Sequence, residues 1–510
     1  MNQLGLPVLS GLIFWPVLGG VLALLAGHRR AGFVRGWTLL VALVELGLAA
    51  VVVAAFRPEE GGLQFVERTP WVPALGLEYF LGVDGLSLWL VALSALLLVV
   101  AVLAAWPLSV EQPAGYAAFL LFLQAGVTGA LVALDLGLFF FFWEAMLIPM
   151  YLLIGMYGGP RRLYAALKFF LYTTVGSLGM LVAILVLYVL HSGQTGRRTF
   201  DLLALAQTRL PSDLAVWLFV LFALAFAIKV PLFPLHTWLP DTYSQAPLAV
   251  LALATMLVKV GAYGFLRIAL PLFPAVGTAW AGVIGLLALV GILYGGLAAI
   301  AQRDLVRLLA YASLSHLGFI VLGAFALNLQ GVQGSLLQMV NHGLSAGALF
   351  VLASFLLART GTLDLTTLGG LAARWPVLAG FFLLSMLSAA GLPGLNGFVG
   401  EVLILLGAYQ RYPVYAVLAT SGVVLAAIYL FRMFRQVMHG PAPALAGPDL
   451  RGREVLALLP LAVLILWIGL FPATFLAPTE ATVQQWLGRL TVASAAPAPE
   501  TVVSLLPVER

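Results

Sequence analysis

Long runs of apolar residues recur along the whole chain, and they restrict the possible folds more than any other feature of the sequence. The hydrocarbon core of a bilayer is about 30 Å thick, so a helix needs roughly 20 apolar residues to cross it. About fourteen segments meet this requirement. They start, each within roughly three residues, near Val8, Val34, Leu86, Gly115, Leu136, Tyr164, Leu214, Leu248, Trp280, Leu305, Val332, Leu378, Val414 and Val455. We therefore predict an all-α polytopic membrane protein, since no segments of alternating polarity indicate a β-barrel.

The composition agrees with a fold that is surrounded by lipid. Hydrophobic residues make up 63% of the chain and charged residues 9%, whereas soluble globular domains carry about 25% charged residues. The net charge of +5 comes from arginines scattered over short loops, which does not predict a nucleic-acid partner. The absence of cysteine excludes disulfides, thiolate metal sites and iron–sulfur ligands on this chain.

The arginines are distributed unequally between the two sides of the predicted bundle. Odd-numbered loops, counted from the first, hold most of them, beginning with Arg29 and Arg30. The other side has more acids and fewer arginines, which are Arg57, Arg68, Arg197, Arg198, Arg209, Arg267 and Arg411. The positive-inside rule then places the odd loops in the cytoplasm and both termini on the outer, periplasmic side.

Two apolar segments are interrupted by residues that cannot continue a helix. The seventh reaches Lys229 and then meets VPLFPLHTWLP, in which Pro231 and Pro234 each remove a backbone donor. The twelfth meets GLPGLNG at 391–397 and resumes at Phe398. Irregular backbone survives at membrane depth only where it is buried in protein or lines a hydrated cavity. Both breaks therefore indicate functional regions.

The two breaks lie five segments apart, which is the pattern expected of two inverted repeats. We predict N-terminal helices 1–3 over residues 1–114, a first repeat of helices 4–8 over 115–270, and a second repeat of helices 9–13 over 271–437. Residues 438–510 would then form a loop, a last transmembrane helix and a C-terminal tail.

Every lysine of the chain, Lys168, Lys229 and Lys259, lies in a hydrophobic segment. A desolvated lysine can release its proton, whereas arginine stays charged in any protein environment. Ionisable groups at membrane depth are costly and usually mark ion pathways, so we predict that Lys229 and Lys259 carry protons. Lys168 lies close to Arg161 and Arg162, and a long side chain reaching toward the membrane surface explains it equally well.

Three acids also lie in apolar segments: Glu45, Glu144 and Glu401. Glu144 stands between aromatic and aliphatic residues in GLFFFFWEAMLIPMY, where an unpaired carboxylate would be costly, and we predict Lys229 as its partner. Glu401 follows the second break, opposite Lys229 in the repeat relation. For Glu45 we expect a local hydrogen-bonded partner.

Three histidines are predicted at membrane depth: His236 in the first break, His316 in LAYASLSHLGFI and His342 in LLQMVNHGLSAG. Polar neighbours such as Ser313 and Asn341 could hold water, so we predict a proton relay. Metal binding is not predicted, because neither an i, i+4 pair of ligands nor an adjacent carboxylate accompanies the histidines.

Nothing in the sequence could supply the energy for proton transport. The chain contains no P-loop motif, no dinucleotide-binding motif and no cofactor-ligating cluster. A partner protein or the gradient of another ion must therefore drive the transport.

Seven motifs point together to one family. They are GVDGLSLWL at 82–90, FFFFWEAMLIPMYLLIG at 139–155, KVPLFPLHTWLPDTYSQAP at 229–247, MLVKVGAYGFLR at 256–267 and, in the second half, YASLSHLGF, NHGLSAGALF and GLPGLNGFVGE. With these motifs the chain resembles the subunit M family, antiporter-like membrane subunits of bacterial respiratory NADH:quinone oxidoreductase (complex I). The resemblance runs from the third helix nearly to the end. Related antiporter-like subunits typically carry lysine where Glu401 stands.

The resemblance implies helices in two inverted five-helix repeats, with helices 7 and 12 broken, in a subunit of a proton-translocating NADH:quinone oxidoreductase. Glu144 would tune Lys229, the switching lysine of the first half-channel. Lys259 would be the central carrier and Glu401 would serve the second half-channel. The implied site residues are thus Glu144, Lys229, Lys259, Glu401, His236, His316 and His342, with the histidines holding water or passing protons.

The same resemblance implies that this chain carries no cofactor and no redox centre. FMN, iron–sulfur clusters, NADH and quinone would belong to partner subunits. Expected partners are the neighbouring antiporter-like subunits and the long lateral helix of the largest one, in the bacterial inner membrane with its lipids. This chain itself has only a short tail after Leu476, with no such helix.

Other readings of the sequence stay open. A subunit of a multi-chain cation/proton antiporter would share the fold and the buried lysines, but a second ion gradient would drive it. A membrane subunit of a hydrogenase-type complex is another possibility. A purely structural scaffold explains neither the paired breaks nor the positions of the lysines.

Overall fold

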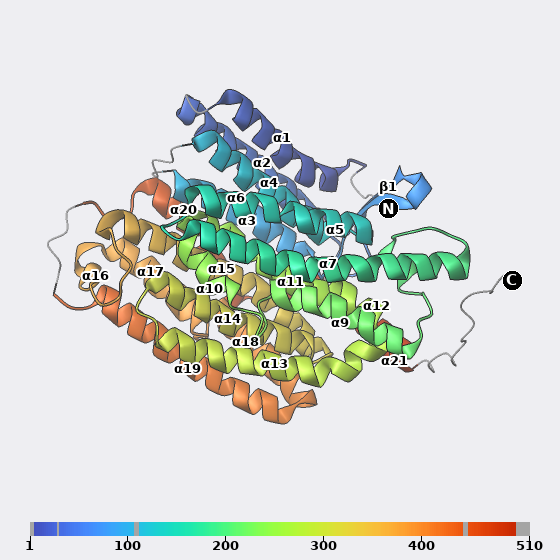
Figure 1. Ribbon diagram of the computed structural model, residues 1–510. Helices are drawn as coiled ribbons and strands as arrows, with labels where there is room; N and C mark the ends of the chain where they lie inside the picture. Colours follow the sequence, from blue (N-terminus) through green and yellow to red (C-terminus); the bar gives the residue numbers. More distant parts are fainter. Residues whose placement is uncertain (1–4, 28–29, 107–111, 442–446, 496–510) are drawn as a thin grey trace.

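The computed structural model describes residues 5–27, 30–106, 112–441 and 447–495. Its helices lie side by side in one bundle, with α1 (Val8–Ala26) and α2 (Ala31–Ala55) at one edge and α13 (Pro274–Ile300) and α19 (Pro413–Met438) at the opposite edge (Figure 1). The other longer helices are α3 (Leu88–Ala105), α4 (Pro113–Val132), α5 (Leu136–Ala145), α6 (Leu147–Tyr157), α7 (Arg162–Thr195), α9 (Ser212–Lys229), α10 (Trp238–Gln245), α11 (Leu248–Gly264), α14 (Leu305–Ala324), α15 (Leu329–Thr360), α17 (Pro376–Ala389), α18 (Asn396–Arg411), α20 (Gly452–Leu470) and α21 (Ala473–Ala495). Short elements are the strands β1 (Gln64–Val72) and β2 (Leu77–Val83), the 3-10 turn η2 (Pro73–Leu75), the π-helical turn η3 (Phe265–Ala269), and the helices α8 (Leu202–Leu205), α12 (Leu270–Leu272) and α16 (Leu371–Arg374).

The predicted polytopic helical fold is confirmed. Within the described ranges, thirteen helical segments are long and apolar enough to cross a membrane, with α5 and α6 counted as one. The predicted twelfth span is divided into α17 and α18, each too short by itself. The predicted starts match these helices to within three residues, except that α13 begins at Pro274 and not near Trp280. A proline at the first helical position has its φ preset for the helix, which fixes this earlier start.

The centre of the bundle is formed by α11 and α15, which pack against each other. In the most apolar stretch of each, 94% of the residues are buried, against 33% in α2 and in α19. The outer helices instead expose leucines and valines, such as Leu43 and Val424, as expected of a surface in contact with lipid. Ionisable groups on α11 and α15 are therefore shielded from both lipid and bulk water.

Both predicted helix breaks are present. The first separates α9, which ends at Lys229, from α10, which begins at Trp238. The indole Nε1 of Trp238 donates to the carbonyl oxygen of Ile228 over 2.8 Å and closes this irregular segment. The second break separates α17 from α18, and it contains Gly391 and Gly394 with φ of 71° and 90°. Only glycine adopts such angles without strain, which explains the GLPG sequence there.

A β-hairpin lies between the second and third spans. β1 pairs antiparallel with β2 outside the helical bundle. The carboxylate of Glu67 on β1 accepts hydrogen bonds from the backbone N–H groups of Leu9 and Ser10, at 2.7 and 3.1 Å, and so holds the hairpin against α1. A single short hairpin carries a weak signal beside twenty-residue apolar segments, which is why the sequence did not reveal it.

The segment after Leu476, predicted as a tail, forms a helix. It belongs to α21, a helix of 23 residues that packs against α13 and α15. The expectation of a short tail was therefore wrong for residues 477–495. The remainder of the predicted tail, 496–510, lies outside the described residues.

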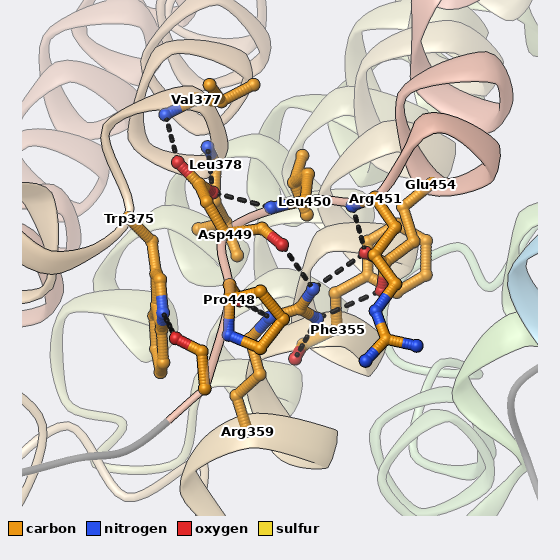
Figure 2. Close-up of polar contacts among 11 residues, drawn as sticks. Phe355, Arg359, Trp375, Val377, Leu378, Pro448, Asp449, Leu450, Arg451 and Glu454 are labelled. Atoms are coloured by element: carbon orange, nitrogen blue, oxygen red, sulfur yellow. Dashed lines mark hydrogen bonds and ion pairs between the residues drawn. The ribbon is translucent and has the colours of Figure 1, made fainter.

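Arg359 at the end of α15 clamps the loop that precedes α20 (Figure 2). Its guanidinium forms a two-pronged ion pair with Glu454, at 3.0 and 2.6 Å, and also donates to the carbonyl oxygen of Asp449 over 3.2 Å. The Asp449 carboxylate in turn accepts from the N–H groups of Val377 and Leu378, at 2.7 and 3.1 Å, and caps α17. This network fixes α17, the first half of the second broken helix, against α15 and α20.

Asp135 positions α5, the helix that carries Glu144. Its carboxylate accepts hydrogen bonds from the backbone N–H groups of Gly137 and Leu138, at 2.9 and 3.0 Å. It also accepts from the backbone N–H of Glu78 on β2 over 3.1 Å. Asp135→Ala should lower the free energy of unfolding by about 1 to 2 kcal/mol, because the cap is lost. Thermal unfolding of the assembled complex measures the change. Asp135→Asn keeps a capping oxygen and should lose less; equal losses would contradict the cap.

Candidate functional site

Lys259 on α11 lies in the centre of the bundle with none of its surface exposed. Its Nζ donates to the carbonyl oxygen of Thr255 over 3.0 Å, and it lies 2.9 Å from Nδ1 of His342 on α15. An ammonium donates and a neutral imidazole nitrogen accepts, so this contact can carry a proton from one side chain to the other.

Two further side chains continue from His342 toward the second break. The rings of His342 and His316, on α14, have centroids 5.9 Å apart. Nδ1 of His316 lies 3.2 Å from Oε1 of Glu401 on α18. We call Lys259, His342, His316 and Glu401 the polar row. Four helices bring these four predicted residues together, and each of the four residues is at most 6% exposed.

A small cavity lies beside the histidines of the polar row. It has a volume of about 20 Å³ and is lined by both histidines together with Ser313, Gln338 and Asn341. This volume has room for one water molecule. Several lining atoms have no hydrogen-bond partner in the described part of the chain: Nε2 of both histidines, Oγ of Ser313 and Oδ1 of Asn341. Buried polar atoms of this kind are normally satisfied by water, and a water here would bridge the two rings, whose centroids are 5.9 Å apart.

The amides and hydroxyls around Glu401 include groups that the sequence analysis did not single out. Gln338 Nε2 donates to Glu401 Oε1 over 3.3 Å. Ser388 Oγ donates to Oδ1 of Asn396 over 2.5 Å, and the Asn396 carbonyl accepts from Asn341 over 2.8 Å. The signal that could have found Gln338 and Asn396 is the one that found the acids, namely a polar residue inside an apolar segment.

Lys229 at the end of α9 is fully buried, and its Nζ has no hydrogen-bond partner within the described ranges. The ammonium lies 4.8 Å from the ring centroid of Trp143, a cation–π contact. Glu144, which follows Trp143 in the chain, interacts electrostatically with the Lys229 ammonium. Its Oε1 is also buried without a hydrogen-bond partner among the described residues. The predicted pair is thus adjacent but not closed into a direct ion pair.

His236 lies within the first break and is separate from the polar row. Its ring stacks on Phe233, with centroids 5.5 Å apart, and packs edge-on against Tyr294 at 4.9 Å. The residue is 3% exposed, and its Nδ1 has no hydrogen-bond partner among the described residues. Aromatic packing therefore holds this histidine near the break that follows Lys229, with one nitrogen left available for a water molecule.

Lys168 has a structural partner that the sequence did not identify. Its Nζ donates to Asp241 Oδ2 over 2.7 Å, and Oδ1 of the same carboxylate accepts from Arg307 over 3.2 Å. Asp241 lies on α10, so this network joins α7 to α14. The side chains are partly exposed, which agrees with the reading that Lys168 reaches toward the membrane surface.

Arg267, expected in an outer loop, is instead buried in the π-helical turn that follows α11. Its guanidinium forms a bidentate ion pair with Asp84, one bond of which measures 2.7 Å, and its Nε donates to the Tyr263 hydroxyl over 2.9 Å. The Tyr263 hydroxyl donates to the carbonyl oxygen of Leu131 over 2.8 Å. This network ties the end of the helix that carries Lys259 to the loop before α3 and to α4.

Comparisons with known proteins agree on one family. The family model described as NADH:quinone oxidoreductase/Mrp antiporter, TM, matches residues 133–428. NADH-quinone oxidoreductase subunit M of Pseudomonas aeruginosa is 42% identical over 505 residues, which cover 94% of this chain and 98% of the relative. A chain of respiratory complex I from Thermus thermophilus with bound NADH superimposes with a TM-score of 0.87 and 36% identity, over 94% of this chain and 99% of that chain. A chain of the Mrp complex from a Dietzia species has the same fold, with a TM-score of 0.83 and 22% identity, over 96% of this chain and 99% of that chain.

Proposed function

Because the chain belongs to the NADH:quinone oxidoreductase/Mrp antiporter transmembrane family, with subunit M as its relative, we propose that it translocates protons in the membrane arm of an NADH:quinone oxidoreductase, complex I. The observation that carries this proposal is the polar row, in which Lys259, His342, His316 and Glu401 follow one another through a buried apolar bundle. Buried ionisable groups arranged in this way are costly to maintain unless they move ions.

The two halves of the site have different roles in this proposal. Lys229 is the switching lysine of the first half, and Glu144 is the acid that interacts with it electrostatically. Lys259 receives the proton at the centre, from where it passes through His342 and His316 to Glu401. His236 holds water beside the first break. The route between Lys229 and Lys259 requires water, since no side chain joins them directly among the described residues.

The driving reaction takes place on other chains. FMN, iron–sulfur clusters, NADH and quinone are proposed on partner subunits, so this chain contributes to a translocase without a redox centre of its own. The neighbouring antiporter-like subunits and the lateral helix of the largest one are the proposed partners, in the bacterial inner membrane. The positive-inside pattern supports termini on the outer side, and the two breaks support inverted repeats of helices 4–8 and 9–13.

A cation/proton antiporter subunit is the second candidate function, because the Mrp chain shares the fold. The two candidates differ in their source of energy. Inside-out vesicles from the native organism should acidify when NADH is added together with a quinone, and deletion of this chain should abolish that acidification. Acidification driven by a sodium or potassium gradient without NADH, and lost in the same deletion, would instead establish the antiporter.

A further inference from the structure

Glu45, which takes no part in the polar row, lies near the middle of α2 with none of its surface exposed. Gln124 on α4 donates through Nε2 to Glu45 Oε1 over 3.1 Å, which confirms the local partner expected from the sequence. The same Nε2 lies 3.2 Å from Oγ of Ser94 and 3.0 Å from Oγ1 of Thr128. We call these four residues the Glu45 cluster. All four are completely buried between α2, α3 and α4.

No cation on the described helices around α2 is placed to neutralise a carboxylate at this position. The helices packed against α2 are α1, α3 and α4, and the only titratable side chain on all three is the hydroxyl of Tyr116. On α2 itself the sole other titratable residue is Arg35, ten residues before Glu45 and so roughly 15 Å away along the helix axis. An isolated carboxylate in an apolar interior costs far more free energy than a neutral acid.

The hydrogen bonds of the cluster point to the same protonation state. Oε2 of Glu45 and Oε1 of Gln124 are both buried without a donor among the residues that the structure describes. An amide oxygen and the oxygens of an ionised carboxylate only accept hydrogen bonds, so neither of these two oxygens can satisfy the other. A proton on Glu45 removes the charge and turns one of its oxygens from an acceptor into a donor. A buried acceptor that stays without a donor would cost about 1 to 3 kcal/mol.

We propose that Glu45 is a proton-binding site beside the polar row, which holds its proton as a carboxylic acid at neutral pH within the Glu45 cluster. This site goes beyond the proposed pathway, because neither the polar row nor Lys229 and Glu144 contacts it. Its ligand is a single proton, and Gln124 is the side chain that positions the acid.

The site is one helix away from the polar row. Ser94 belongs to α3, and its neighbours Leu93 and Leu97 lie against Gly343 and Gly347 of α15, next to His342. α3 also packs on α11. Loss of the proton would therefore place a negative charge one helix away from Lys259, where it would favour the ammonium form through Coulomb attraction. The Glu45 cluster thus stores a proton, and its protonation state changes the electrostatic potential at Lys259.

Infrared difference spectroscopy of the assembled complex tests the protonation state. The parent minus Glu45→Gln spectrum at neutral pH should contain the C=O stretching band of one protonated carboxyl and no carboxylate band. Glutamine keeps the size and the hydrogen-bonding capacity of the side chain, so this variant should assemble. A difference spectrum with carboxylate bands in place of the acid band would overturn the proposal.

Two further variants make the result independent of Glu45→Gln. Gln124→Leu removes the donor to Glu45 Oε1, so the acid band of this complex should shift to higher frequency; an unshifted band would mean that the cluster does not hold the proton. Glu67→Gln is the matched control, because Glu67 accepts from the N–H groups of Leu9 and Ser10 and from the Ser10 hydroxyl. Its difference spectrum should contain carboxylate bands, which calibrates the assignment.

Discussion

Lys259→Met should abolish proton translocation by the assembled complex. Lys259 is the one cation of the polar row, and its contact with His342 is the step through which a proton would enter the histidines. A missing proton donor typically lowers the rate of the dependent step by about 100-fold or more. Methionine fills similar space and leaves only neutral atoms unpaired, so the fold should be retained. Proton uptake by inside-out vesicles, with NADH and quinone, measures the loss.

The chain provides matched controls for this prediction. Lys229→Met should be equally severe, since Lys229 is also fully buried, whereas Lys168→Met should lose much less, because Lys168 is partly exposed and forms an ion pair with Asp241. Glu144→Asp should be milder than Glu144→Ala, since it keeps the charge near Lys229. If Lys259→Met and Lys168→Met translocated protons equally well, the polar row would not be the pathway.

Arg267→Met should prevent assembly or strongly destabilise the complex. The substitution leaves Asp84 buried without its bidentate partner, and removal of one member of a buried ion pair typically costs about 3 to 5 kcal/mol. The Tyr263 hydroxyl also loses its donor. The amount of this chain in the membrane-embedded complex, together with the thermal unfolding of any complex that forms, gives the measurement.

A double substitution separates loss of the pair from loss of the arginine itself. Arg267→Met combined with Asp84→Leu leaves no unpaired charge and should recover much of the stability, so the two effects should not add. Arg57→Met is the matched control, because the Arg57–Glu60 pair is exposed and exposed pairs contribute little. Equal stability of Arg267→Met and Arg57→Met would show that the buried pair does not hold the end of α11.

The sequence was sufficient to predict those features that depend on neighbouring residues. Runs of about twenty apolar residues determine the spans, because each helix must cross the same thickness of hydrocarbon. Pro231, Pro234 and the glycines at 391 and 394 determine the two breaks, because their backbone restrictions act locally. The cost of an ionisable group in lipid singled out Lys229, Lys259, Glu144 and Glu401 in the same way.

The errors have equally specific causes. Arg267 looked like one more loop arginine, because the sequence does not show that Asp84, far away in the chain, meets it inside the protein. The hairpin β1–β2 and the helix α21 were missed because neither has an apolar segment long enough to stand out. For Lys168 the sequence left two readings open, because its partner Asp241 lies on a short helix after the first break.

Sequence alone thus determined that this chain spans the membrane many times, where its helices break and which ionisable residues lie at membrane depth. Only the tertiary structure decided that His342 meets Lys259, that His316 faces Glu401, and that Lys229 and Glu144 approach without closing a pair. The physical reason is that hydropathy and backbone restrictions act within one helix, whereas these contacts depend on how each helix is rotated and packed against three or four others.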